Sequence, residues 1–147
     1  AYRTVLRALE RRAHARADLA RRLLRRGHPA DAVHAALDRV AGLGLLDDVR
    51  FAAHYVQTRA VRGRGPARIL RDLLALGVER SVIDRALADE WPPEADRTAL
   101  PFALAAQRSR QLGDLPRPVK RRRLLAYLSR RGYGGHDALE AVRRALG

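Results

Sequence analysis

The sequence predicts an all-α protein built from three consecutive units of three helices each. Apolar residues make up 47% of the 147 residues and aromatic residues only 5%. The apolar set is dominated by alanine, leucine and valine, a mixture that favours helices over strands. A pattern of apolar residues at helical spacing occurs three times, each time around one glycine, and segments rich in glycine or proline separate the three occurrences.

The repeated pattern is centred on Gly27, Gly77 and Gly132. Positions eight and four residues before each glycine lie on one helix face, and the glycine ends that helix because it adopts the left-handed cap conformation without a Cβ clash. Positions six, nine and ten after the glycine form the apolar stripe of a second helix. The matched residues are Leu19, Leu23, Val33, Ala36 and Leu37 in the first unit, Ile69, Leu73, Ile83, Ala86 and Leu87 in the second, and Leu124, Leu128, Ala138, Ala141 and Val142 in the third.

A further helix is predicted before each of these helix pairs. These helices run from Thr4 to about Arg12, from Asp48 to about Arg62 and from Glu94 to about Leu112. The segments GLGLLDD (42–48) and WPPEAD (91–96) connect the units. The expected three-helix repeats are therefore residues 1–46, 47–92 and 93–147.

Two adjacent acids, Asp47 and Asp48, stand directly before the first helix of the second unit. One of them is expected to be the N-cap, because a carboxylate there accepts otherwise unpaired backbone N–H groups. Both charges also lie at the positive end of the helix dipole. Phe51 follows at helical spacing and is expected to face inward. A divalent-metal site built on the pair is the alternative, although no third ligand stands nearby.

The segment GRGPARIL begins with Gly63 and Gly65, which break the chain, and Pro66, which suits the first turn of a helix. A phosphate-binding loop is the alternative interpretation. The segment lacks the Lys-Ser/Thr ending and the preceding strand that such a loop requires.

The sequence shows no motif for catalysis. It has no cysteine, no nucleophile elbow and no pair of histidines at metal-binding spacing, so we expect neither an enzyme nor a bound cofactor or metal. His34 and His54 lie within predicted helices and are expected to be half-buried. No segment is apolar over a bilayer's thickness, and we expect a cytoplasmic monomer without membrane contact.

The strongest functional signal is a formal net charge of +14, which indicates an anionic partner. Lys120 is the only lysine, and the other basic residues are arginines that occur in clusters. The basic residues that we select as the candidate binding set are Arg59, Arg62 and Arg64, then Lys120, Arg121, Arg122 and Arg123, then Arg25 and Arg26.

The segment LLDDVRFAAHYVQTRAVRGRGPARILRDLLALGVERSVIDRAL (45–87) resembles the RecX family, which regulates the bacterial recombinase RecA. The shared features are the Asp-Asp pair, Phe-Ala, an arginine, Gly-x-Gly and Leu-Gly-Val, so Asp47, Asp48, Phe51 and Gly77 are structural motif positions. The segment KRRRLLAYLSRRGY (120–133) is similar to that family's third repeat. Ala15 and Asp18 replace a Ser-x-x-Glu capping box of the family, and the helix that starts there is expected to fray.

The resemblance implies tandem three-helix repeats in an elongated, curved, solenoid-like molecule. It also implies a protein that binds the RecA filament on single-stranded DNA and limits its growth, ATP hydrolysis and strand exchange. A helical module that binds DNA on its own is the alternative, because short helices joined by tight glycine turns can form helix-turn-helix units. We expect such a module to contact phosphates and not to read bases, because asparagine is absent and only three glutamines are present. A helical scaffold for another acidic protein remains a third interpretation.

Overall fold

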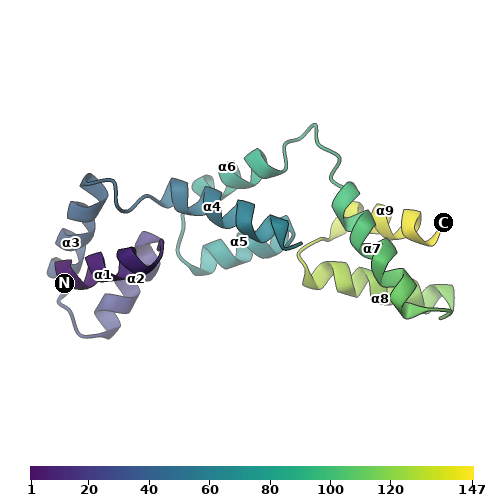
Figure 1. Ribbon diagram of the computed structural model, residues 1–147, viewed down its shortest axis with the longest axis horizontal. Helices are drawn as coiled ribbons and strands as arrows, with labels where there is room; N and C mark the ends of the chain where they lie inside the picture. The colour runs from purple at the N-terminus through teal and green to yellow at the C-terminus, as the bar shows by residue number, and fades with distance from the viewer. The chain divides into compact units, whose positions relative to one another are not determined.

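The computed structural model describes residues 1–147 and consists of nine α-helices with no strand (Figure 1). The all-α prediction is therefore confirmed. None of the helices is both long enough and apolar enough to cross a membrane. The helices are α1 (Tyr2–Arg11), α2 (Arg16–Arg25), α3 (Ala30–Gly42), α4 (Asp48–Val61), α5 (Pro66–Ala75), α6 (Arg80–Glu90), α7 (Ala99–Leu112), α8 (Arg117–Arg130) and α9 (Gly135–Leu146).

The chain forms two compact units. One contains Ala1–Val56 and Asp72–Ala86, and the other contains Gln57–Arg71 and Leu87–Gly147. The border between them passes through α4, α5 and α6, so each of these helices contributes residues to both units. The first unit holds α1, α2 and α3 complete, and the second holds α7, α8 and α9 complete.

Each unit has its own hydrophobic core. In the first unit α1 and α2 both pack against α3, and their buried side chains include Val5, Leu19 and Val40. In the second unit α7, α8 and α9 pack against one another around Ala105, Leu124 and other buried residues (Figure 1). Burial of these apolar faces is the main source of helix stability, because isolated helices of this length are marginal in water.

The fifteen residues of the repeated pattern occupy equivalent environments. Fourteen of them are buried, and Leu87 is half-buried. The three central glycines have φ angles of 89°, 81° and 94°, in the left-handed region that the pattern requires. At each turn the glycine N–H bonds to the carbonyl three residues back, and the next N–H bonds to the carbonyl of the repeated leucine: Leu23, Leu73 or Leu128. Sequence periodicity thus located the turns and the core faces correctly.

Some boundaries and burial predictions were wrong. Helix α7 begins at Ala99 and not near Glu94, because Asp96 forms a local turn that holds Thr98 outside the helix. The Asp96 carboxylate accepts hydrogen bonds from the Thr98 N–H at 3.0 Å and from its hydroxyl at 2.7 Å. His34 and His54 are exposed, not half-buried, because they lie on the outer faces of their helices.

Candidate anion-binding surface

The two adjacent acids cap two different helices. The carboxylate of Asp47 accepts hydrogen bonds from the N–H groups of Val49, at 3.0 Å, and Arg50, at 3.2 Å. Asp47 is therefore the N-cap of α4, as the pattern predicted for one member of the pair. Phe51 is half-buried in the same helix, and its ring lies 6.0 Å from that of Tyr55.

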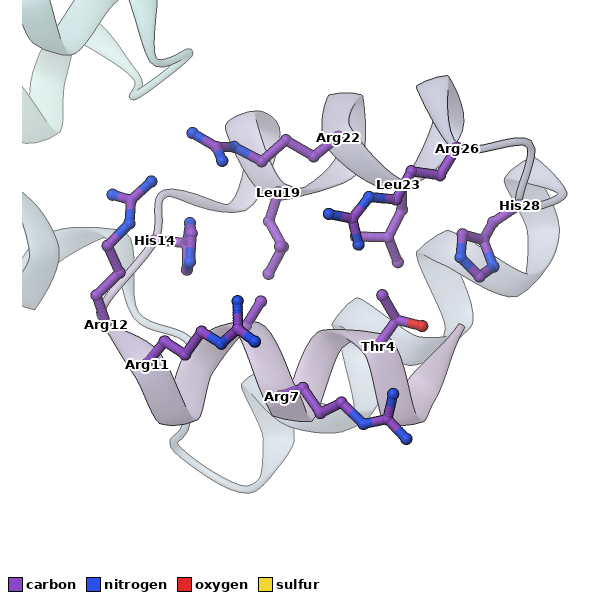
Figure 2. A pocket seen from close by; sticks show the side chains of 11 residues that line it. Thr4, Arg7, Arg11, Arg12, His14, Leu19, Arg22, Leu23, Arg26 and His28 are labelled. Carbon is purple, nitrogen blue, oxygen red and sulfur yellow. The ribbon is translucent and has the colours of Figure 1, made fainter.

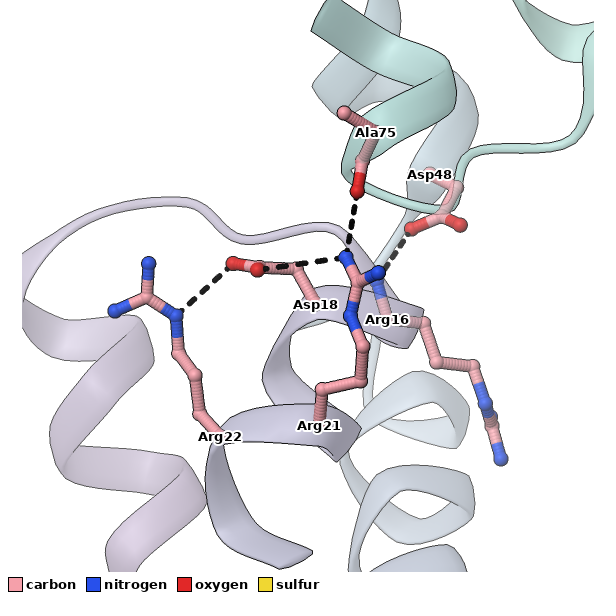
Figure 3. Close-up of polar contacts among 6 residues, drawn as sticks. All are labelled: Arg16, Asp18, Arg21, Arg22, Asp48 and Ala75. Carbon is pink, nitrogen blue, oxygen red and sulfur yellow. Dashed lines mark hydrogen bonds and ion pairs between the residues drawn. The ribbon is translucent and has the colours of Figure 1, made fainter. Parts of the chain in front are cut away.

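Asp48 caps α2, a helix that lies earlier in the chain. Its Oδ1 accepts a hydrogen bond from the Arg16 N–H at 2.9 Å, at the first residue of α2 (Figure 3). The local N-cap residue, Ala15, makes no side-chain cap bond. The expectation of a frayed α2 start was therefore wrong, because a carboxylate 32 residues away replaces the missing local cap.

The start of α2 packs against the end of α5. Asp18 is buried and forms ion pairs with Arg22 at 3.0 Å and with Arg21 at 3.7 Å. The Arg21 guanidinium also donates to the carbonyl of Ala75, the last residue of α5, at 2.8 Å (Figure 3). Gly77 lies so close to α2 that a Cβ there would meet the Ala17 Cβ at 2.5 Å. Gly77 is thus required both for its turn and for this close approach.

An equivalent contact joins the start of α5 to the end of α8. The Gly65 N–H donates to the Arg131 carbonyl, and the Ala67 N–H donates to the Gly132 carbonyl at 3.2 Å. A Cβ on Gly65 would meet the Gly132 backbone at 2.6 Å, and a Cβ on Gly132 would meet the Arg68 Cβ at 2.6 Å. The same contact therefore occurs twice. The start of α2 packs on the glycine turn that ends α5, and the start of α5 packs on the glycine turn that ends α8.

The α5–α8 contact brings five arginines around one shallow cavity of about 320 Å³, together with the ring of Tyr127. No acidic side chain lines this cavity. We call its arginines the junction cluster; they are Arg62, Arg64, Arg68, Arg130 and Arg131. Guanidinium groups present several N–H donors in a planar fork, which suits phosphate and carboxylate oxygens.

Main-chain carbonyls hold two members of the junction cluster in place. Arg68 donates to the Arg130 carbonyl at 3.3 Å, and Arg131 donates to the Arg62 carbonyl at 3.5 Å. The Arg131 guanidinium also lies over the ring of Tyr127, 5.1 Å from its centroid. These contacts restrict side-chain rotation, so an anion bound here would lose less affinity to side-chain ordering.

The structure brings together only part of the basic set selected from the sequence. Arg62 and Arg64 lie in the junction cluster, whereas Arg59 is half-buried and donates to the Thr58 hydroxyl at 3.0 Å. Arg25 and Arg26 are exposed at the end of α2. The run from Lys120 to Arg123 lies near the start of α8, roughly 15 Å along the helix from its end.

Sequence reasoning did not select three members of the junction cluster, Arg68, Arg130 and Arg131. Arg130 and Arg131 were visible as a basic pair beside Gly132. A signal was available, since arginines adjoin both Gly65 and Gly132, but only the fold shows that these glycines touch. The two segments are more than sixty residues apart in the chain.

Comparison with known families decides the classification. The model of the first three-helix domain of RecX matches residues 1–39, and that of the second three-helix domain matches residues 47–87. The two matches together cover more than half of the chain. The chain belongs to the RecX family.

Relatives in the RecX family extend over nearly the whole chain. The regulatory protein RecX of Halorhodospira halophila is 41% identical over 95% of this chain and 84% of its own length. The regulatory protein RecX of Mycobacterium ulcerans is 39% identical over 93% of this chain and 79% of its own length. Membership therefore identifies the chain as a regulatory protein of the RecX type.

Two solved structures have the same fold. A crystal structure of a regulatory protein RecX superposes with a TM-score of 0.81 at 25% identity, over 97% of this chain and 70% of the other. The RecX of Lactobacillus salivarius superposes with a TM-score of 0.82 at 19% identity, over 99% of this chain and 93% of the other.

Proposed function

We propose that this RecX-family protein is a non-enzymatic inhibitor of the RecA recombinase. In this proposal it binds the RecA filament on single-stranded DNA as a monomer and limits filament growth, ATP hydrolysis and strand exchange. The observation that carries the proposal is family membership combined with a cavity that five arginines and no acidic side chain line.

Arginine chemistry supports both partners in the filament. Guanidinium groups form bidentate, charge-assisted hydrogen bonds with the carboxylates of a recombinase and with the phosphates of DNA. The junction cluster supplies five such groups around one cavity. We further propose that the exposed run Arg121–Arg123, Lys120, Arg25, Arg26 and Arg59 contribute additional contacts.

The proposal is tested by measuring ATP hydrolysis by RecA on single-stranded DNA at increasing concentrations of this protein. We expect hydrolysis to fall as the ratio of this protein to RecA rises. Unchanged hydrolysis at every ratio, with RecA still bound to the DNA, would contradict an inhibitory function.

The junction cluster is tested in the same assay with the double variant Arg62→Gln/Arg130→Gln. We expect half-maximal inhibition to require at least tenfold more protein, because each charge-assisted hydrogen bond contributes roughly 1.5–3 kcal/mol. The control is Arg3→Gln/Arg85→Gln, which removes the same charge from two exposed helix positions outside the cluster. Equal losses in the two variants would show that only net charge matters.

A second candidate function is DNA binding without RecA. It is favoured by the exposed side chains of Arg121, Arg122 and Arg123, none of which forms an ion pair. Equal affinity for bare single-stranded DNA and for the RecA filament would favour this function.

We also propose that the chain consists of three repeats, residues 1–46, 47–92 and 93–147. The first helix of each repeat is α1, α4 and α7, respectively.

A further inference from the structure

A second basic cavity lies in the first unit, apart from the junction cluster. It has a volume of about 440 Å³ and opens between α1 and α2, with Leu19 and Leu23 on its wall (Figure 2). We call it the α1–α2 cavity. Its basic side chains are Arg7, Arg11 and Arg12 at one side and Arg22 and Arg26 at the other.

The α1–α2 cavity carries positive charge that the protein does not neutralise. No acidic side chain lines it, and Arg22 alone among its five arginines forms an ion pair, with Asp18 at 3.0 Å. Arg11 and Arg26 extend over the space between the two helices (Figure 2). Like charges held this close repel one another, and the repulsion is strongest beside an apolar wall. An anion in the cavity would remove this cost.

His14 provides an independent observation. Its side chain lies at one end of the cavity, beside Arg12 and Leu19 (Figure 2), and the residue is only 6% exposed. Its Nδ1 is buried and has no hydrogen-bond partner. A buried polar atom without a partner is unfavourable, and such atoms often mark the place of a ligand.

We propose that the α1–α2 cavity binds a phosphate group, with the arginines as charge-assisted donors and the His14 ring at one end of the site. The volume lies within the range of small-ligand sites, about 300–1,000 Å³, and suits a short chain of linked phosphates. Such phosphates could belong to a free nucleotide or to DNA, which share this chemistry.

Titration calorimetry with inorganic pyrophosphate tests the site. We expect saturable binding of pyrophosphate, in which one site per chain is weakened at least tenfold in Arg11→Gln/Arg26→Gln and unaffected in Arg62→Gln/Arg130→Gln. The matched control, Arg3→Gln/Arg85→Gln, removes the same charge from exposed positions on α1 and α6 outside the cavity, and we expect it to change affinity less than twofold. Absence of saturable binding, or equal weakening in both variants, would overturn the proposal.

A short single-stranded oligonucleotide distinguishes the two sources of phosphate. If a thymidine octanucleotide displaces pyrophosphate competitively, the site takes phosphates of DNA. If ATP displaces pyrophosphate and the octanucleotide does not, the site takes the phosphate chain of a free nucleotide. Neither a recombinase nor a filament is present, so the result is independent of the inhibitory function proposed above.

Protonation of His14 gives a second readout that a loss of charge elsewhere would not move. Burial lowers the pKa of His14, Arg12 and Arg22 lower it further, and the Ala8 carbonyl and Asp18 act in the opposite direction. His14 also lines a second, smaller cavity next to the start of α4. The other titratable or charged groups that line either of these cavities are Arg7, Arg11, Arg26, His28, Asp47, Arg50 and His54. A phosphate bound among the cavity's arginines places negative charge near the ring and favours its charged form.

The imidazole resonances of His14 should therefore titrate at higher pH when pyrophosphate is present, and pyrophosphate should bind more tightly as the pH falls towards the ordinary pKa of histidine. Both effects should be lost in Arg11→Gln/Arg26→Gln. A titration curve for His14 that pyrophosphate leaves unchanged would contradict phosphate binding in the α1–α2 cavity.

Discussion

At the residue scale, a few positions determine how closely the helices pack. At some of them a side chain would not fit, and at others a buried polar group has no partner. Gly65 does not have a positive φ, so its glycine is not required by backbone conformation. It is required by space, since a Cβ would lie 2.6 Å from the backbone of Gly132. Tyr133, in contrast, has a large side chain that is buried, and its hydroxyl has no hydrogen-bond partner.

We expect Gly65→Ala to destabilise the protein by about 1–3 kcal/mol, the usual cost of inserting a methyl group where backbone cannot move aside. The control is Gly134→Ala, because Gly134 has φ −144° and a Cβ there meets nothing within 4 Å. Urea unfolding measures both. A Gly65→Ala variant as stable as Gly134→Ala would show that the contact between α5 and α8 opens at little cost.

We expect Tyr133→Phe to stabilise the protein by up to about 1 kcal/mol, because it removes a buried hydroxyl that lacks a partner. Burial raises the pKa of Tyr133 to about 12. The unfolded chain therefore loses this proton near pH 10 while the folded chain keeps it, so stability falls as the pH rises from 10 to 12. The variant lacks this part of the fall, and urea midpoints at pH 8 and 10.5 will measure the difference.

At the element scale, the N–H groups at two helix starts find their hydrogen-bond acceptors in residues outside the helix. The start of α2 depends on Asp48, and the start of α5 depends on carbonyl groups of Arg131 and Gly132. The unpaired N–H groups of a helix start need acceptors, and the acceptors here come from residues distant in sequence. Hydrogen bonds from residues distant in sequence therefore complete the first turns of α2 and α5.

We expect Asp48→Ala and Asp47→Ala to expose different helices, with each variant serving as control for the other. Loss of a cap costs about 1 kcal/mol. Asp48→Ala should accelerate amide hydrogen exchange at Arg16, whereas Asp47→Ala should accelerate it at Val49 and Arg50. The same exchange pattern in both variants would contradict the division of the two caps.

At the scale of the whole molecule, a net charge of +14 and two arginine-lined cavities dominate the chemistry. Binding of a polyanion to such a surface is driven largely by counterion release, and it weakens as salt is added. The junction cluster and the α1–α2 cavity belong to different units, so each can be altered without changing the other.

Binding of single-stranded DNA should therefore depend steeply on salt. If the five junction arginines each contact one phosphate, the logarithm of the association constant should fall with a slope of about −3.5 against the logarithm of salt concentration. Arg62→Gln/Arg130→Gln should reduce the steepness by roughly 1.4. An unchanged slope in this variant, measured by fluorescence anisotropy, would place the DNA contacts elsewhere.

Local sequence patterns were enough to predict the helices, their glycine turns and their core faces. The reason is physical: helical periodicity, left-handed glycine caps and N-terminal carboxylates act over a few residues, so Leu19, Gly77 and Asp47 carry their roles in their local context. The same local rules placed the start of α7 too early, because they did not anticipate the turn formed by Asp96.

Which charged groups meet depends on how the helices pack. Asp48 reaches α2, and Arg130 joins Arg62, through contacts between residues 32 or more positions apart, and sequence spacing carries no information about such distances. Burial of His14 likewise depends on how α1 and α2 close together. The helices could be derived from the chain, whereas the two arginine-lined cavities exist only where separate helices converge.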